Sequence, residues 1–134
     1  MSEINIPRSV WTGFLETFSE RHAGLPIQVE THDVQTDETV ASQISALHSI
    51  ELDDEDEKNP RINVTVLYDN KQLKHILFRP SRVSLRISEE GEDSLRISSL
   101  NTDTTIRIHG AKKVDPLDVL KALNILHVPR DEAA

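Results

Sequence analysis

Basic side chains in the second half of the chain have the types and the spacing that could do chemistry. They stand at polar positions of consecutive segments in which apolar and polar residues alternate, and four of them form the candidate anion- or partner-binding set: Lys74, Arg86, Arg96 and Arg107. If those segments follow one another as an antiparallel meander, the four side chains become neighbours on one sheet face across four strands. Guanidinium groups there can bind a phosphate, a carboxylate ligand or an acidic partner through forked hydrogen bonds.

This basic stripe has a second interpretation. Like charges opposite one another on a sheet are unfavourable by roughly a few tenths of a kcal/mol per pair, so neighbouring acids such as Glu51, or bulk water, could neutralise the arginines. Nucleic acid is disfavoured as the partner because the chain is acidic and only Phe78 is placed to stack on a base.

The stripe depends on the register of the strands. Two-residue turns at 69–70 and 101–102 predict these opposed pairs: Val66 with Leu73, Val64 with His75, Ile97 with Ile106, and Leu95 with Ile108. The hairpins between them then pair Leu77 with Val83 and Ile87 with Leu95. In this register the apolar residues agree on one face and the basic residues lie on the other.

An acidic run from Glu51 to Glu57 holds six carboxylates in seven positions. It lacks the glycine and the ligand spacing of a calcium-binding loop, so we expect a solvated loop and no metal. An alternative is that this loop docks on the basic stretch of its own sheet or on a second copy of the chain, which would make the contact sensitive to salt.

No motif for catalysis, metal binding or cofactor binding occurs in the sequence. The six histidines have no metal-ligand spacing, cysteine is absent, and neither a nucleophile elbow nor a glycine-rich phosphate loop is present. We interpret His75 as a hydrogen-bonded core residue and His22 as a donor to the last carbonyls of the first helix. A small hydrolase that uses either histidine is the least favoured function.

Charge is distributed unevenly along the chain. The net charge is −8, with 3 basic and 13 acidic side chains in residues 1–60 and 12 basic and 10 acidic side chains in residues 61–134. The absence of cysteine favours a reducing compartment, and the sequence begins without a signal-like or membrane-spanning segment. We therefore expect a cytoplasmic protein with no membrane partner.

A helix and a set of strands must position these residues. Trp11, Phe14, Leu15 and Phe18 fall on one helical face, and Gly24 is a suitable residue to follow the helix end. Alternating apolar residues predict strands at 27–31, 40–42, 47–52, 62–66, 73–78, 83–87, 95–97 and 106–108.

The end of the sequence has a helical pattern again. Asp115 and Pro116 are typical of a helix start, and the apolar face of that helix carries three candidate partner-binding residues: Leu120, Leu123 and Leu126. The expected organisation is a helix plus β-meander domain at 1–110, with a C-terminal helix and tail at 111–134 appended to the same domain.

Several short patterns carry a family resemblance. The segment Ile6-Pro7-Arg8-x-x-Trp11-x-x-Phe14, together with His22-x-Gly24 and Pro80-Ser81-Arg82-Val83, resembles a family of short bacterial proteins with a domain of unknown function. The resemblance covers roughly residues 5 to 109. It implies a bacterial origin and supports the helix-plus-meander fold, but it transfers no activity, cofactor or site residue.

Together these patterns predict an α+β fold: an antiparallel meander of about six to eight strands, able to curl toward a small barrel, covered by the N-terminal helix and followed by a C-terminal helix. The expected function is that of a non-enzymatic binding or regulatory module acting through protein contacts or self-association. The alternative is a small β-domain that binds an anion or RNA through the basic stripe.

Overall fold

The protein folds as one antiparallel sheet with a single helix against it, within residues 2–87 and 93–109, which the computed structural model describes. The helical elements are a 3₁₀ turn, η1 (Arg8–Val10), and α1 (Trp11–His22). The strands are β1 (Ser2–Ile6), β2 (Pro26–Asp33), β3 (Glu38–Ala41), β4 (Ser45–Asp53), β5 (Arg61–Tyr68), β6 (Lys71–Phe78), β7 (Arg82–Ile87), β8 (Asp93–Ser98) and β9 (Thr102–Ile108). The predicted α+β class is therefore confirmed. The predicted helix from Asp115, with Leu120, Leu123 and Leu126, lies outside the described residues.

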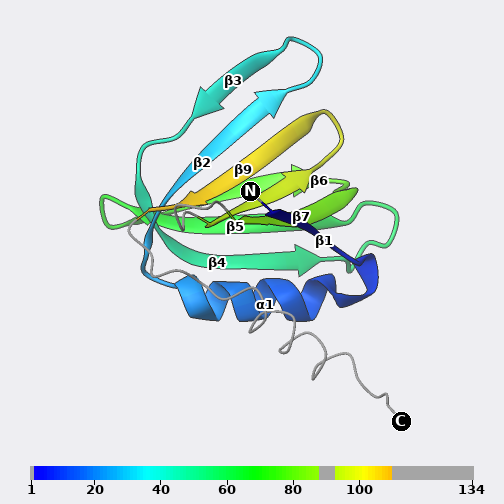
Figure 1. Ribbon diagram of the computed structural model, residues 1–134, viewed down its shortest axis with the longest axis horizontal. Helices are drawn as coiled ribbons and strands as arrows, with labels where there is room; N and C mark the ends of the chain where they lie inside the picture. Colours follow the sequence, from blue (N-terminus) through cyan, green and yellow to red (C-terminus); the bar gives the residue numbers. More distant parts are fainter. Residues whose placement is uncertain (1, 88–92, 110–134) are drawn as a thin grey trace.

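Two meanders flank β2 in this sheet, whose strand order is β1-β7-β8-β9-β2-β4-β5-β6 (Figure 1). The sheet is open, with β1 at one end and β6 at the other, and β3 pairs with β2 outside this path. Figure 1 shows the β2–β3 hairpin extending away from α1. The prediction of one continuous meander from β5 to β9 was wrong, because β6 and β7 follow each other in the chain but do not pair.

The aromatic stripe of α1 covers the apolar side of the sheet, as its spacing predicts. The side chains of Trp11, Phe14, Leu15 and Phe18 are all buried, and they share one core cluster with apolar residues from both meanders. Burial of each such side chain stabilises the fold by roughly 1.5–3 kcal/mol. The indole N–H of Trp11 also donates to the carbonyl oxygen of Ile6 at 2.8 Å, which ties the helix start to β1.

A hydroxyl group fastens α1 to β4. The strand β2 pairs with β4 only at its first two residues, so most of that edge of β4 has no neighbouring strand. There the buried Ser19 hydroxyl accepts the Ile50 N–H at 2.7 Å and donates to the Ile50 carbonyl at 3.1 Å. The Ser19 hydroxyl thus satisfies the backbone N–H and carbonyl of Ile50, which a neighbouring strand would otherwise satisfy.

The helix ends where the sequence predicts. Gly24 follows the cap residue Ala23 and has a φ of +83°, a conformation that costs glycine little. His22 donates from Nδ1 to the carbonyl oxygen of Phe18 at 2.8 Å, one turn before the helix end and not to one of the last carbonyls as expected.

The predicted register was correct in one hairpin and wrong in the others. Val66 lies opposite Leu73 and Val64 opposite His75, as expected. The other observed pairs are Leu77 with Ile62, Ile87 with Asp93, Leu95 with Leu85 and Ile106, and Ile97 with Val83 and Thr104. Strands β7 to β9 are shifted by two residues from the prediction. The turn between β8 and β9 is centred on Leu100 and Asn101, one residue earlier than predicted, and the Ser99 N–H donates to the Thr102 carbonyl oxygen at 2.8 Å. An even shift keeps every side chain on its predicted face.

Candidate functional site

Three of the four predicted basic residues come together on the outer face of the sheet. Arg86 on β7 lies across from Ser94, and Ser94 lies across from Arg107 on β9. Arg96, on β8, stands between these two strands and points to the same face, while the alternating apolar residues of all three strands point into the core. The sequence therefore predicted this arginine cluster correctly.

Lys74 does not belong to the cluster. It lies on β6 opposite Thr65, at the end of the sheet that is farthest along the strand order from β7. The prediction that Lys74 neighbours Arg86 was wrong because it required β6 and β7 to pair. Phe78, the candidate for base stacking, also lies on β6 and away from the arginines.

Each arginine of the cluster contacts one carboxylate from a neighbouring strand. Arg96 Nη2 lies 3.2 Å from an oxygen of Asp103, and Arg107 Nη2 lies 3.2 Å from an oxygen of Glu30. In both pairs the acid sits diagonally across the strand pair, within reach of a long side chain. Arg86 has the longest contact, with its Nε 3.9 Å from an oxygen of Glu3.

Hydrogen bonds favour the ionised form of two of these acids, Glu3 and Asp103. The Ser84 hydroxyl donates to Glu3 at 2.7 Å, and this bond, with the nearby charges of Arg86 and Arg82, lowers the pKa of Glu3 against the opposing effect of burial. Burial alone would raise the pKa of Asp103. Hydrogen bonds from Ser98 and Arg96 and the positive charge of Arg96 outweigh this effect and lower the pKa. The outer face therefore holds a set of fixed opposite charges at neutral pH.

The three arginines, together with Glu30 and Asp103, line a hollow of about 270 Å³, which we call the arginine hollow. Its lining residues come from β2, β3, β7, β8 and β9: Glu30, His32, Thr39, Arg86, Arg96, Asp103, Thr105 and Arg107. The three arginine side chains keep 34%, 36% and 49% of their surface exposed in sequence order. Each guanidinium contacts its carboxylate through a single nitrogen, although the group carries five N–H donors.

Arg86 has the most unused hydrogen-bonding capacity of the three. Its Nε is buried and has no hydrogen-bond partner, and its distance to Glu3 is too long for a hydrogen bond. The Arg86 side chain keeps 34% of its surface exposed, so its other N–H donors remain open to an acceptor from a ligand.

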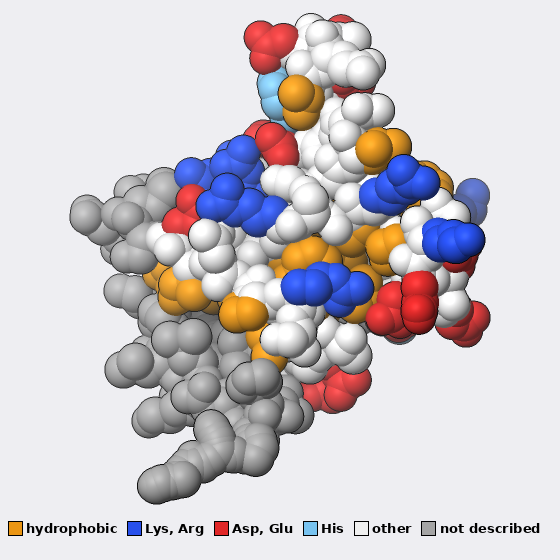
Figure 2. Space-filling view, turned by 90° about the vertical axis from the view of Figure 1, so that its right-hand side faces the viewer, with side chains coloured by type: hydrophobic (Ala, Val, Ile, Leu, Met, Phe, Trp, Pro, Cys, Tyr) orange, Lys and Arg blue, Asp and Glu red, His pale blue; other side chains and the backbone are white. Residues whose placement is uncertain are grey.

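Charge on the surface seen in Figure 2 is mixed. In the view of Figure 2, Lys and Arg side chains stand in small separate groups with Asp and Glu side chains among them, and they form no continuous basic surface. Such a pattern suits a partner with a few well-placed carboxylates better than the even negative charge of a nucleic-acid backbone.

The acid that faces Arg86 was not predicted from the sequence, which suggested Glu51 as a neutralising residue. Glu51 lies on β4 beside α1, and the acids in contact with the cluster are Glu3, Glu30 and Asp103. Strand β1, which carries Glu3, was not predicted. Its signal was the alternation of Ile4 and Ile6 with polar residues directly before Pro7.

Of the histidines that the structure describes, His32 lines the arginine hollow and the others are not among its lining residues. His22 is buried, and burial lowers its pKa against the smaller opposing effect of its bond to Phe18. His75 is half-buried beside a hollow of about 200 Å³, and burial lowers its pKa too. The structure shows no hydrogen bond that would make His75 the satisfied core residue expected from the sequence.

Within residues 2–87 and 93–109, no three His, Asp or Glu side chains are arranged to hold a metal ion. Over the same part of the chain, no helix has the length and the apolar character needed to cross a membrane.

Comparison with known proteins gives no relative on which to base a function: no family model, no curated protein and no solved structure matches this chain.

Proposed function

We propose that the protein is a non-enzymatic binding module that acts through protein contacts, and that the arginine hollow receives carboxylate side chains of the partner. A second copy of the chain is a possible partner of this chemistry, because its acidic run supplies the carboxylates. The proposal rests on one observation, the three guanidinium groups that share a hollow while each uses a single nitrogen for its own acid.

The arrangement supports recognition rather than mere charge neutralisation. Glu3, Glu30 and Asp103 hold the arginines in place, so less side-chain entropy is lost when a ligand arrives. The three arginines line a space of about 270 Å³, which is large enough for one or two carboxylate side chains. Charge-assisted hydrogen bonds of this kind contribute about 1.5–3 kcal/mol each.

Binding of an acidic peptide tests the proposal. The probe is a fluorescein-labelled peptide with the sequence of residues 50–59, followed by fluorescence anisotropy at low salt. We expect saturable binding that weakens as salt screens the charges. The triple variant Arg86→Ala, Arg96→Ala, Arg107→Ala should bind about tenfold more weakly or worse, since loss of even one such bond has that effect.

A matched variant removes the same charge elsewhere. Lys58, Lys71 and Lys74 are exposed and lie outside the hollow, so their triple replacement by Ala should leave binding close to that of the wild type. Equal loss in both variants would show attraction by net charge alone and would contradict the proposal. An unlabelled single-stranded RNA that displaces the peptide would instead favour the nucleic-acid alternative.

A further inference from the structure

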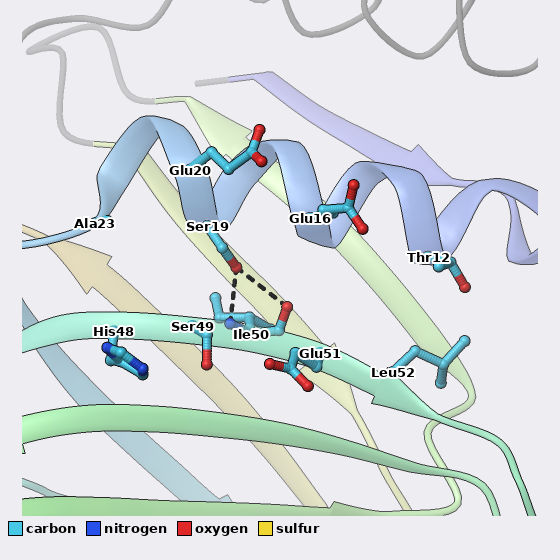
Figure 3. A pocket seen from close by; sticks show the side chains of 10 residues that line it. All are labelled: Thr12, Glu16, Ser19, Glu20, Ala23, His48, Ser49, Ile50, Glu51 and Leu52. Carbon is cyan, nitrogen blue, oxygen red and sulfur yellow. Dashed lines mark hydrogen bonds between the residues drawn. The ribbon is translucent and has the colours of Figure 1, made fainter.

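A second surface lies on the opposite side of the protein, between α1 and β4. It is a groove of about 370 Å³ that runs from Thr12 to Ala23 along the helix and from His48 to Leu52 along the strand. Figure 3 looks into this groove and shows Ser19 bonded to Ile50 between the two walls. His48 also lines the groove, and it has no partner residue on β5 because the register between β4 and β5 shifts there.

The groove is apolar between acidic walls. Leu52 and Ala23 contribute apolar surface, whereas Glu16 and Glu20 stand along α1 and Glu51 on β4 (Figure 3). In the described part of the chain, these three glutamates form no ion pair. The surface thus suits a segment that offers leucine-type side chains together with lysines.

We propose that residues 115–128 of the same chain dock in this groove as an amphipathic helix. The segment has the required composition, with apolar residues at helical spacing and three basic residues in or directly before it: Lys112, Lys113 and Lys121. With Asp115 and Asp118 included, residues 112–128 carry a net charge of +1 (three Lys minus two Asp), opposite in sign to the groove walls.

The path of the chain places this segment at the correct end. The backbone N–H of His109 donates to the carbonyl oxygen of Pro26 at 2.8 Å, three residues after Ala23. Gly24 in turn donates to Leu47, next to His48. The chain therefore leaves the sheet beside the end of the groove formed by Ala23 and His48.

The lengths also agree. A helix of residues 115–128 would be about 21 Å long, and the stretch of α1 from Thr12 to Ala23 covers about 17 Å, at 1.5 Å per residue. Residues 110–114 can span up to about 17 Å when extended. The segment can thus return along α1 without disturbing the sheet, and this inference is independent of the arginine hollow.

Paramagnetic relaxation tests the docking in the full chain. The absence of cysteine allows one nitroxide label at Asn124→Cys, a polar position of the segment. We expect the amide signals of Ser19 and of residues 48–52 to lose most of their intensity, and those of β7 and β8 to keep it. Unaffected groove signals would overturn the proposal.

A mixture separates docking within one chain from docking between chains. Isotope-labelled wild-type protein mixed with spin-labelled, unlabelled protein should show no broadening of the groove. Broadening in this mixture would mean that the segment binds a second copy and would contradict the proposal.

Two further variants test the chemistry of the contact. Leu120→Asp with Leu123→Asp should abolish the broadening in the spin-labelled chain, and Glu16→Lys with Glu20→Lys should weaken it. The matched control, Glu55→Lys with Glu57→Lys, reverses the charge of two residues in the exposed loop and should leave the broadening unchanged. Unchanged amide positions on β7 and β8 confirm in each case that the sheet has folded.

Discussion

His22 gives the core a dependence on pH. Its ring stacks on Phe18 with a centroid distance of 4.2 Å, its Nε2 is buried without a hydrogen-bond partner, and burial lowers its pKa below the usual value near 6.5. Protonation would place a charge in the core. The folded state therefore holds this histidine neutral at a pH where the unfolded chain already binds a proton.

The sign of the effect follows from this difference. As pH falls below about 6.5, the unfolded state takes up the proton first, so the free energy of unfolding decreases until pH passes the lower pKa of the folded state. We expect His22→Phe, which keeps an aromatic ring beside Phe18, to be less sensitive to pH between 7 and 5. Urea unfolding at several pH values measures the difference, with His48→Asn as the control at an exposed histidine. Parallel pH profiles for wild type and His22→Phe would rule out the assignment.

At the scale of the elements, the attachment of α1 depends on Ser19. Ser19→Ala removes the acceptor of the Ile50 N–H and the donor to the Ile50 carbonyl, which then remain buried and unsatisfied. We expect a loss of about 2 kcal/mol in the free energy of unfolding, since each unsatisfied buried group costs about 1–3 kcal/mol. Thr12→Ala, at an exposed position of the same helix, should change it by less than about 0.5 kcal/mol. Equal effects of the two substitutions in urea unfolding would show that Ser19 does not fasten the helix.

The elements also show which parts of the fold a sequence can predict. The stripe of Trp11, Phe14 and Phe18 predicts both the helix and its buried face, because helix periodicity is a local property. The sheet face to which Arg96 points was predictable as well, since side chains alternate between the two faces and a register shift of two residues does not change this alternation. The insertion of β2 between two meanders was not predictable, because it arises from pairing between segments far apart in the chain.

The same limit applied to the candidate site. Arg86, Arg96 and Arg107 follow one another along consecutive hairpins, so local rules brought them together correctly. Their acids come from more distant places, and Glu3 is 83 residues away from Arg86 in the sequence. Lys74 was wrongly predicted to join the arginines because strands that are consecutive in the chain were assumed to be neighbours in the sheet.

For the whole molecule, the structure separates two surfaces. The outer face of β7, β8, β9 and β2 carries the arginine hollow, and α1 with β4 forms the acidic groove on the other side of the core. A partner can therefore reach the arginine hollow while the groove is occupied. Loss of the arginines should not unfold the protein, because exposed ion pairs of this kind contribute only about 0–1 kcal/mol each.

The central claim is that the arginine hollow binds carboxylates, and the arginine Nε–H signals in a nitrogen–proton correlation spectrum report on it directly. On titration with the acidic peptide of residues 50–59, we predict that the Arg86 signal shifts most, because its guanidinium lies 3.9 Å from Glu3 and is not held by a hydrogen bond to that carboxylate, followed by those of Arg96 and Arg107. The Nε–H signals of Arg61 and Arg79, which lie outside the hollow, should stay in place. Shifts of equal size at all five arginines, or no shift at Arg86, would contradict the account.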